Sequence, residues 1–600
     1  MGQAHDALSS RLGDRLDEDS SDGLSDRFRA ASLLRWAPAI TLAAFLLPIA
    51  AGLAGTLLPA MGWLPALGAN SFSLAAWHTL FQAPGFVSAW QLTLFTGLLS
   101  TLLSLLLALG VVAFLHQRPA ARRLGEWMAP MLAMPHSALA IGFAFLILPS
   151  GWLSRAVSPT LTGWELPPDV STVGHPSGWP LVAALLLKEV PYLVLMTLGA
   201  LNQINAAAQL AVARSLGYGP AQAWFLVVLP QVYRQIRLPV CAVLAFSLSV
   251  VDVALILGPS NPPTLAVLAV RWFADPDTRW VFPAAAAATL LMLTVLGSLL
   301  LWRGLEVLAR QWLLHRTRQG VRSARSAVAA GLATALAAAL LGAAATSMLA
   351  LALWSVALQW RWPAFLPSAW TWDNWWRQAS SLVPPTVTTL ALAAVSTLLA
   401  LVLVLACLEN EVRRRPSGRA ASGDPGIAGR RALWLLYVPL LLPQVAFLFG
   451  LQVLLVRVGA DGNFWAVVWA HLMFVLPYLF LSLADPWRAF DPRYTRTALS
   501  LGASHWRVFW RVKLPILLRP VLLSSAVAFA VSVGLYLPTL FAGAGRIATL
   551  TTEAVTLSSG ADRRVIATWA ILQAAFPLLV YALAAALPRW LYRHRQGLAT

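Results

Sequence analysis

Twelve long apolar runs are the feature that most constrains this chain of 600 residues. About 20 consecutive apolar residues span a bilayer, and backbone groups inside lipid must pair within their own helix or within a closed barrel. Because the sequence is 59% hydrophobic and only 11% charged, it carries more apolar surface than one soluble core could bury. The pattern therefore predicts an all-α integral membrane protein with about 12 transmembrane helices.

The runs divide evenly between two halves of the chain. They are expected at roughly 38–60, 88–115, 128–150, 179–201, 239–259, 280–303, 327–358, 384–408, 432–456, 464–484, 520–541 and 565–588. We interpret residues 38–303 and 327–588 as two six-helix repeats, with a cytoplasmic linker at 304–326. Residues 1–37, rich in Ser, Asp and Arg, are expected to form a disordered cytoplasmic tail, and residues 589–600 a second tail.

The basic residues lie on alternating loops of this topology. If the N-terminus is inside, inside segments hold 33 of the 43 Lys and Arg residues, outside loops hold 9, and Lys188 lies within a span. Positive charge is retained on the cytoplasmic side of membrane proteins, so both termini are predicted to be cytoplasmic. The net positive charge is thereby explained without a nucleic-acid partner.

Several short segments recur in the second half. LSTLLSL at 99–105 resembles VSTLLAL at 395–401, Pro135 and Gly142 match Pro443 and Gly450, and Pro-Tyr-Leu at 191–193 matches 477–479. Six spans return the chain to its starting side, so the repeats should be parallel and related by an axis along the membrane normal. Their interface is the expected transport pathway.

The most informative repeat lies between the fourth and fifth spans of each half. SLGYGPAQAWFLVVLP at 215–230 and SLGASHWRVFWRVKLP at 500–515 share their frame at an offset of 285 residues. Gly217 and Gly502 suit a sharp end to one short helix, and Pro230 and Pro515 suit the first turn of the next. In the second copy, aromatic residues alternate with Arg507, Arg511 and Lys513, which also fits an interfacial re-entry helix lying along a membrane surface.

Both segments resemble the cytoplasmic loop signature of permeases of bacterial binding-protein-dependent ABC importers. That signature has Glu-Ala-Ala, then Gly after three residues, then a hydrophobic-x-Leu-Pro ending. The residues identified with it are Ala213, Ser215, Leu216, Gly217, Leu229 and Pro230 in the first loop and Ala498, Ser500, Leu501, Gly502, Leu514 and Pro515 in the second. Ala211 and Arg496 depart from the pattern, because they stand where the family usually has Glu.

The resemblance implies a type I ABC importer permease fold, most similar to fused permeases of the thiamine, ferric iron and polyamine or sulfate class. It implies two copies of an ATPase subunit docked on the two loops, an extracytoplasmic solute-binding protein, and alternating access in the bacterial inner membrane. No cofactor is expected on this chain, and ATP with Mg²⁺ would act through the ATPase. The two lysines follow Leu187 and Val512, whereas a phosphate-binding loop needs Gly before its Lys.

Ionisable residues inside a membrane are costly and are candidates for function. Lys188 and Glu189 are adjacent, so they point about 100° apart on a helix and need other partners. Asp252 lies in the fifth span, which lines the pathway in the family that this sequence resembles. It is expected either to contact a cationic solute or to pair with Lys188, and these three residues form the candidate pathway.

Other polar residues are given structural interpretations. His136 and His471 are expected to hydrogen-bond at helix kinks, and Cys241 and Cys407 to be buried small apolar residues. No catalytic set and no metal-ligand spacing is recognisable, so a transport permease rather than an enzyme is predicted. On the outside, Arg546, Arg563 and Arg564 could contact a binding protein or simply be solvated.

The main alternative is an ion-gradient-driven secondary transporter with six plus six helices. It shares the span count and the basic central loop and requires no ATPase partner. That fold does not need matched loops centred on Gly, and HQRPAARRLGE after the second span lacks the acidic and glycine pattern typical of that superfamily. A membrane enzyme or polysaccharide exporter is a more distant alternative. The solute itself is not identified by the sequence.

Overall fold

The computed structural model describes residues 34–116, 128, 130–320, 327–414, 435 and 437–593. The predicted N-terminal tail up to residue 33, the end of the linker at 321–326 and the tail residues 594–600 lie outside the described residues. Within them the chain is almost entirely helical, as predicted. A single antiparallel pair, β1 (Ala357–Gln359) with β2 (Ala369–Trp370), follows the first span of the second half.

The first half contains a first helix Leu34–Ala60, η1 (Pro65–Leu67), α2 (Ala75–Gln82), α3 (Phe86–Leu115), α5 (His136–Ile147), α6 (Trp152–Val157), α7 (Trp179–Leu201), α8 (Ala206–Ser215), α9 (Pro220–Ala223), η2 (Trp224–Val228), α10 (Leu229–Ser249), α11 (Asp252–Leu257), α12 (Leu265–Phe273), η3 (Thr278–Trp280) and α13 (Val281–Arg318).

The second half contains α14 (Ala327–Ser355), α15 (Asp373–Arg414), α17 (Val445–Arg457), α18 (Phe464–Arg488), α19 (Pro492–Ser500), α20 (His505–Val508), η4 (Phe509–Lys513), α21 (Leu514–Ile516), α22 (Leu518–Val533), α23 (Leu537–Gly543), α24 (Leu550–Leu557) and α25 (Arg563–Leu591).

The number of membrane-crossing helices differs from the predicted twelve. Among the described residues nine helices are long and apolar enough to cross a bilayer, or ten if His505–Ile516 and Leu518–Val533, bent by 77°, form one span. The run at 239–259 is divided because Val250 is extended, with ψ of 136°, and separates α10 from α11. The run at 432–456 produces α17, which has 13 residues, and residues 432–434 are not described.

The first helix of each half packs against the opposite half. A Cβ atom on Gly450 of α17 would lie 1.9 Å from the carbonyl oxygen of Gly52, so the backbones of α17 and the first helix touch. Correspondingly, a Cβ on Gly142 of α5 would lie 2.8 Å from the carbonyl oxygen of Ser347 in α14. Small residues permit such close helix crossings in membranes. The matched glycines Gly142 and Gly450 are therefore the sites where the first helix of the opposite half crosses α5 and α17.

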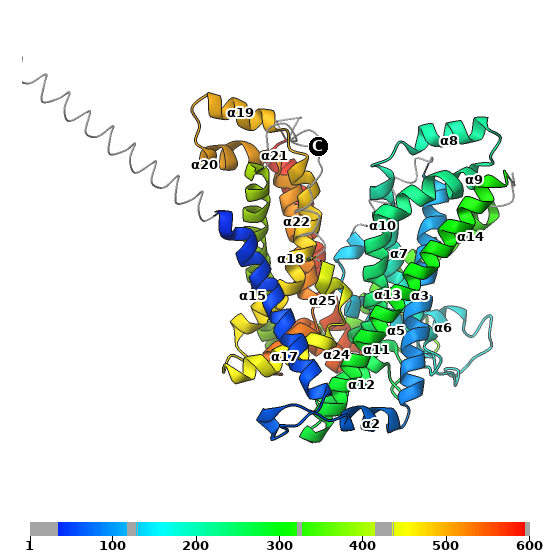
Figure 1. Ribbon diagram of the computed structural model, residues 1–600. Coiled ribbons are helices and arrows are strands. Elements are labelled where there is room, and N and C mark those ends of the chain that lie inside the picture. Colours follow the sequence, from blue (N-terminus) through cyan, green and yellow to red (C-terminus); the bar gives the residue numbers. More distant parts are fainter. Residues whose placement is uncertain are drawn as a thin grey trace, which may run out of the picture.

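Among the described residues the apolar interior contains one shared core, two separate large ones and a small cluster of Ala393, Phe529 and Val533. The shared core contains side chains of both halves, from α5, α11, α12, α17, α23 and α24 among others. A second core is built mainly from α3, α7, α8 and α10, and a third from α15, α18 and α22. In Figure 1 the shared core occupies the lower part of the molecule, and the helices of the two other cores diverge towards the top.

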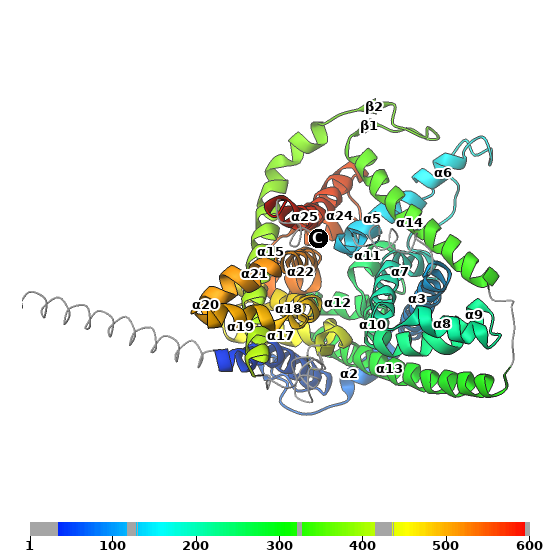
Figure 2. The same cartoon turned by 90° about the horizontal axis from the view of Figure 1, so that it is seen from above.

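The repeated loops lie at the diverging end. α8 and α9 stand at the top of one group of helices, and α19, α20 and α21 at the top of the other (Figure 1). Seen from above, the two loops lie on opposite sides of the molecule (Figure 2). The helix bundle thus presents two similar, separated projections on one face.

Candidate functional site

The two repeated loops have the same backbone at their central glycine. Gly217 has φ of +85° and Gly502 has φ of +83°, a left-handed conformation that residues with a side chain rarely adopt. In the first loop the N–H of Tyr218 donates to the carbonyl of Ala213, at 3.2 Å. In the second, the N–H of Ala503 donates to the carbonyl of Ala498, at 3.1 Å. Each pair closes the helix end in a Schellman turn.

The residues beside these glycines are also matched. Ser215 Oγ donates to the carbonyl of Val212 at 2.8 Å, and Ser500 Oγ donates to the carbonyl of Arg496 at 2.9 Å. Leu216 and Leu501 follow the serines and are 58% and 82% exposed. Apolar side chains held at the tip of a projection are available for contact with another protein.

Both loops continue into a π-helix, which no sequence pattern predicted. η2 and η4 lie at the same 285-residue offset. Leu229 donates its N–H to the carbonyl of Trp224, five residues back, and Leu514 does the same to Phe509. Pro230 and Pro515 follow directly. A proline ring collides with the carbonyl four residues before it in an α-helix, so the wider π-helix accommodates the repeated Leu-Pro.

The first loop is anchored to the helices beneath it. Trp224 is fully buried in the core that includes α3 and α7, and its ring lies 4.6 Å from that of His116 at the end of α3. Burial of His116 lowers its pKa below the ordinary value. Gln209 of α8 and Gln231 of α10 bond to each other, with one contact of 2.7 Å. These contacts join the loop rigidly to α3, α8 and α10.

The second loop is anchored by an ion pair. Lys513 Nζ lies 2.7 Å from Glu409 Oε2 of α15 and 4.5 Å from the ring centre of Trp487 in α18. Lys513 therefore faces inward, because a carboxylate and an aromatic face attract its ammonium group. Trp506 and Trp510 instead point outward, at 70% and 49% exposed. Ala211 and Arg496, where Glu was expected, are both exposed.

The intramembrane charges do not form the pair that was considered. Lys188 Nζ donates to the carbonyl of Met134 rather than forming an ion pair with Asp252 in the described part of the chain. α11, which begins at Asp252, nevertheless packs against α7, which carries Lys188, and against α24 of the second half. Asp252 is the first residue of α11, where a carboxylate is favoured by the helix dipole.

Glu189 is buried and hydrogen-bonded to two hydroxyl groups. Ser104 of α3 donates to Oε2 at 2.8 Å, and Ser247 of α10 donates to Oε1. The carboxyl group therefore connects three helices of the first half. Its neighbours satisfy it without a solute.

The buried histidine of the second half has a related arrangement. His471 of α18 bonds through its two ring nitrogens to Ser532 Oγ at 2.8 Å and Thr539 Oγ1 at 2.9 Å. Ser532 lies 285 residues after Ser247, so equivalent serines bind an acid in one half and an imidazole in the other. Both partners are hydroxyls on other helices, one on each side of the break between α22 and α23, rather than groups beside Pro477 in its own helix. His136 packs on Phe246, with ring centres 4.8 Å apart.

The described residues contain neither a disulfide bond nor a cluster of metal-ligand side chains. Cys241 and Cys407 are free and half-buried, so they are less buried than expected. Within the described segments no group of three His, Cys, Asp or Glu side chains is placed to hold a metal ion.

The face opposite the loops contains an arginine that the sequence did not single out. Arg155 of α6 is buried and donates to the carbonyls of Arg361 at 2.9 Å, Ala364 at 3.0 Å and Ser150 at 3.0 Å. It thereby fixes the segment after β1 to the first half. Arg546 pairs with Asp461, which makes simple solvation an incomplete description of this face.

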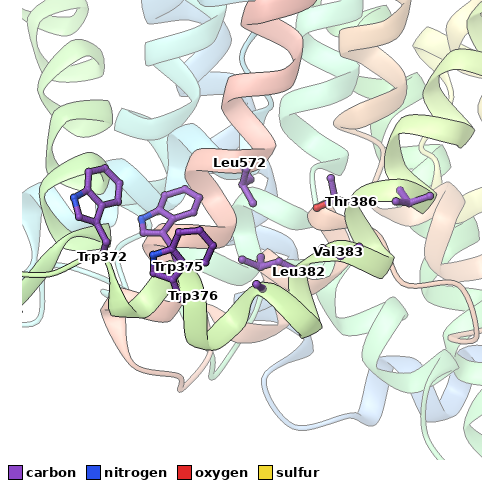
Figure 3. A pocket seen from close by; sticks show the side chains of 9 residues that line it. Trp372, Trp375, Trp376, Leu382, Val383, Thr386 and Leu572 are labelled. Atoms are coloured by element: carbon purple, nitrogen blue, oxygen red, sulfur yellow. The ribbon is translucent and has the colours of Figure 1, made fainter.

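An apolar pocket of about 720 Å³ lies beside α15 and α25. Figure 3 shows Trp372, Trp375 and Trp376 near Leu382 and Leu572 on its wall. The lining carries no charged side chain. Tryptophan is enriched at membrane–water interfaces, so this cluster is typical of a lipid-facing surface rather than of a binding site for an ionic solute.

Comparisons with known proteins identify the class. The family "Binding-protein-dependent transport system inner membrane component" matches residues 420–595. The inner membrane ABC transporter permease protein YnjC of Escherichia coli (strain K12) is 34% identical over 533 residues, covering 88% of this chain and 93% of YnjC. The chain therefore belongs to the family of ABC transporter permeases.

Two shorter relatives agree with this class. The spermidine/putrescine transport system permease protein PotC of Escherichia coli (strain K12) is 26% identical over 110 residues, 18% of this chain and 40% of PotC. The molybdenum transport system permease protein ModB of Mycobacterium tuberculosis is 38% identical over 122 residues, 18% of this chain and 46% of ModB. The protein is thus the permease subunit of an ABC importer and a multi-pass protein of the inner membrane, not a secondary transporter.

Proposed function

We propose that the loops 213–230 and 498–515 each dock one copy of an ABC ATPase subunit, so that two copies drive one permease chain. The observation that carries this proposal is the identical backbone of the two loops, with a Schellman turn at Gly217 and Gly502 followed by a π-helix. Two equal projections on one face suit two equal partners. The exposed Leu216 and Leu501 would supply apolar contacts.

ATP and Mg²⁺ would act only through the ATPase, and the chain itself would bind no cofactor. Closure of the two ATPase copies on ATP would bring the loops together. Because each loop is anchored in its own core, its motion would carry a whole group of helices, and the pathway between the groups would open alternately to the two sides.

The loops define the cytoplasmic face, and both termini would lie on that side. The distribution of 33 basic residues supports this orientation. The opposite face, with Arg155, Asp461 and Arg546, would receive the solute-binding protein. Its fixed contacts favour a preformed docking surface.

Of the candidate pathway residues, Asp252 fits a role in transport best. It begins α11, which packs against α7 of the first half and α24 of the second. Lys188 would position it, and Glu189, satisfied by Ser104 and Ser247, would support the helices around it. The relatives PotC and ModB are named for spermidine/putrescine and molybdenum transport, and a small charged solute is accordingly proposed here.

The docking proposal is tested by replacing Gly502 with Val. A Cβ there meets nothing within 4 Å, so any effect comes from the positive φ, which a β-branched residue adopts only with strain. Gly545, with φ of +71° and nothing within 4 Å, offers a matched control on the opposite face. We expect Gly217→Val/Gly502→Val to lose the co-purifying ATPase while Gly545→Val retains it. Equal ATPase recovery from the two variants would refute the docking role.

A further inference from the structure

A buried polar contact joins the two halves of the chain across the shared core. Gln573 of α25 donates from Nε2 to Ser137 Oγ of α5, in the other half, at 2.7 Å. The same nitrogen donates to Thr551 Oγ1 of α24 at 2.7 Å. Gln573, Ser137 and Thr551 have no exposed surface. Gln573 is thus held by a partner in its own half and by one in the opposite half.

This contact lies where several helices begin or end. α5 starts at His136, α22 ends at Val533, and α24 starts at Leu550. Thr551 Oγ1 donates in turn to the carbonyl of Val533. The side-chain oxygen of Gln573 is buried and has no hydrogen-bond partner among the described residues. Burial of an unpaired oxygen costs free energy, and the Gln573 oxygen would gain hydrogen bonds if water entered this region.

A second contact between the halves is aromatic. The ring of Phe273 in α12 stacks on Phe449 of α17, with centres 3.9 Å apart and planes 12° apart. Phe541 of α23 approaches Phe273 edge-on, with centres 6.2 Å apart. Phe273 belongs to the first half, whereas Phe449 and Phe541 belong to the second. Phe449 and Phe541 belong to the shared core, and Phe273 packs against it. α12 and α17, which carry Phe273 and Phe449, lie at the end opposite the loops (Figure 1).

We propose that the Gln573–Ser137 hydrogen bond and the Phe273–Phe449 stack form the outer gate of the permease, closed in this structure and opened when the loops approach each other. The proposal rests on the proposed function for the assignment of the outer side. Opening would separate this hydrogen bond and this ring stack, together with the bond of 2.9 Å from the Arg563 guanidinium to Ser150 Oγ, which also joins the two halves. Gln573 would keep its hydrogen bond to Thr551, because both residues belong to the same half. Its unpaired oxygen would become hydrated.

The aromatic part of the gate is tested by disulfide crosslinking. In the full-length chain with Cys241→Ala and Cys407→Ser, the pair Phe273→Cys/Phe449→Cys is purified with whatever ATPase stays bound and is oxidised with copper phenanthroline. We expect efficient crosslinking without nucleotide and a severalfold lower yield after ATP and vanadate trapping. An unchanged yield in a complex that retains the ATPase would overturn the gate without affecting the docking proposal.

A matched pair controls for general effects of nucleotide. Phe447 and Phe474 also stack, with ring centres 6.0 Å apart, but both belong to the second half. The pair Phe447→Cys/Phe474→Cys should crosslink equally with and without nucleotide. A parallel fall in both pairs would indicate a nonspecific change and would overturn the assignment.

The polar part is tested without any ATPase. Ser137→Ala removes the Gln573–Ser137 hydrogen bond and leaves the bond from Gln573 to Thr551. It should lower the crosslinking yield of the Phe273/Phe449 cysteine pair by shifting the closed-to-open ratio about fivefold, the factor that matches a typical net hydrogen bond. An undiminished yield would refute the polar part of the gate even if no ATPase binds.

Discussion

At the residue scale, the repeated serines show how one position serves two chemistries. Ser247 donates to Glu189, while Ser532, its counterpart, bonds to His471. Both contacts join the fourth and fifth spans of their own half. Side-chain hydrogen bonds hold membrane helices together because lipid offers polar groups no alternative partner. The duplication has therefore kept the hydroxyl and changed the group that it binds.

The importance of this contact can be tested at Glu189. Replacing both Ser104 and Ser247 with Ala should lower stability by about 1–3 kcal/mol for each oxygen left without a donor. Glu189→Gln should cost less, since the neutral amide is easier to bury. Thermal unfolding in detergent, followed by tryptophan fluorescence, measures both. A double-serine variant as stable as the parent would show that Glu189 has other support.

At the element scale, the crossing of the first helix over α17 depends on glycine. Gly450→Leu places a side chain where the carbonyl of Gly52 lies, and overpacking of this kind costs about 1–3 kcal/mol or more. We expect poor membrane insertion or a strongly lowered unfolding midpoint.

Gly297 of α13 provides the comparison for this prediction. A Cβ there meets nothing within 4 Å, so Gly297→Leu should leave the midpoint unchanged or raise it slightly. If Gly450→Leu left the unfolding midpoint as unchanged as Gly297→Leu does, the first helix and α17 would not cross as closely as described here.

The anchor of the second loop is also a property of elements. Lys513 joins η4 to α15 through Glu409, and both side chains are largely buried. Breaking a buried ion pair costs about 3–5 kcal/mol, because one charge is left buried without its partner. Lys513→Met should destabilise the loop by no more than this amount, since Arg413 remains 3.1 Å from the Glu409 carboxylate.

Adding Glu409→Gln to Lys513→Met should recover part of that loss, because no buried charge then remains unpaired. Limited proteolysis of the 498–515 loop, together with the unfolding midpoint, reports the order of stability. A double variant that is less stable than Lys513→Met would contradict the ion-pair interpretation.

At the scale of the whole molecule, the division into one shared and two separate cores suggests how the permease moves. The separate cores carry one loop each, so the loops can approach only if their groups of helices rotate about the shared core. Spin labels at Val212→Cys and Tyr494→Cys, on α8 and α19, should move closer on ATP and vanadate trapping. Pulsed electron resonance that finds the same distance in both states would exclude this motion.

Much of this protein was determined by local features of the sequence. The apolar runs, the duplication and the Gly-centred loops could be identified because hydrophobicity, glycine conformation and proline geometry act over a few residues. The exchange of the first helices, the shared core, the inward position of Lys513 and the partners of Glu189 and His471 could not. These depend on contacts between residues that are far apart in the sequence, such as Gly52 with Gly450, and only the packing of the folded chain selects them.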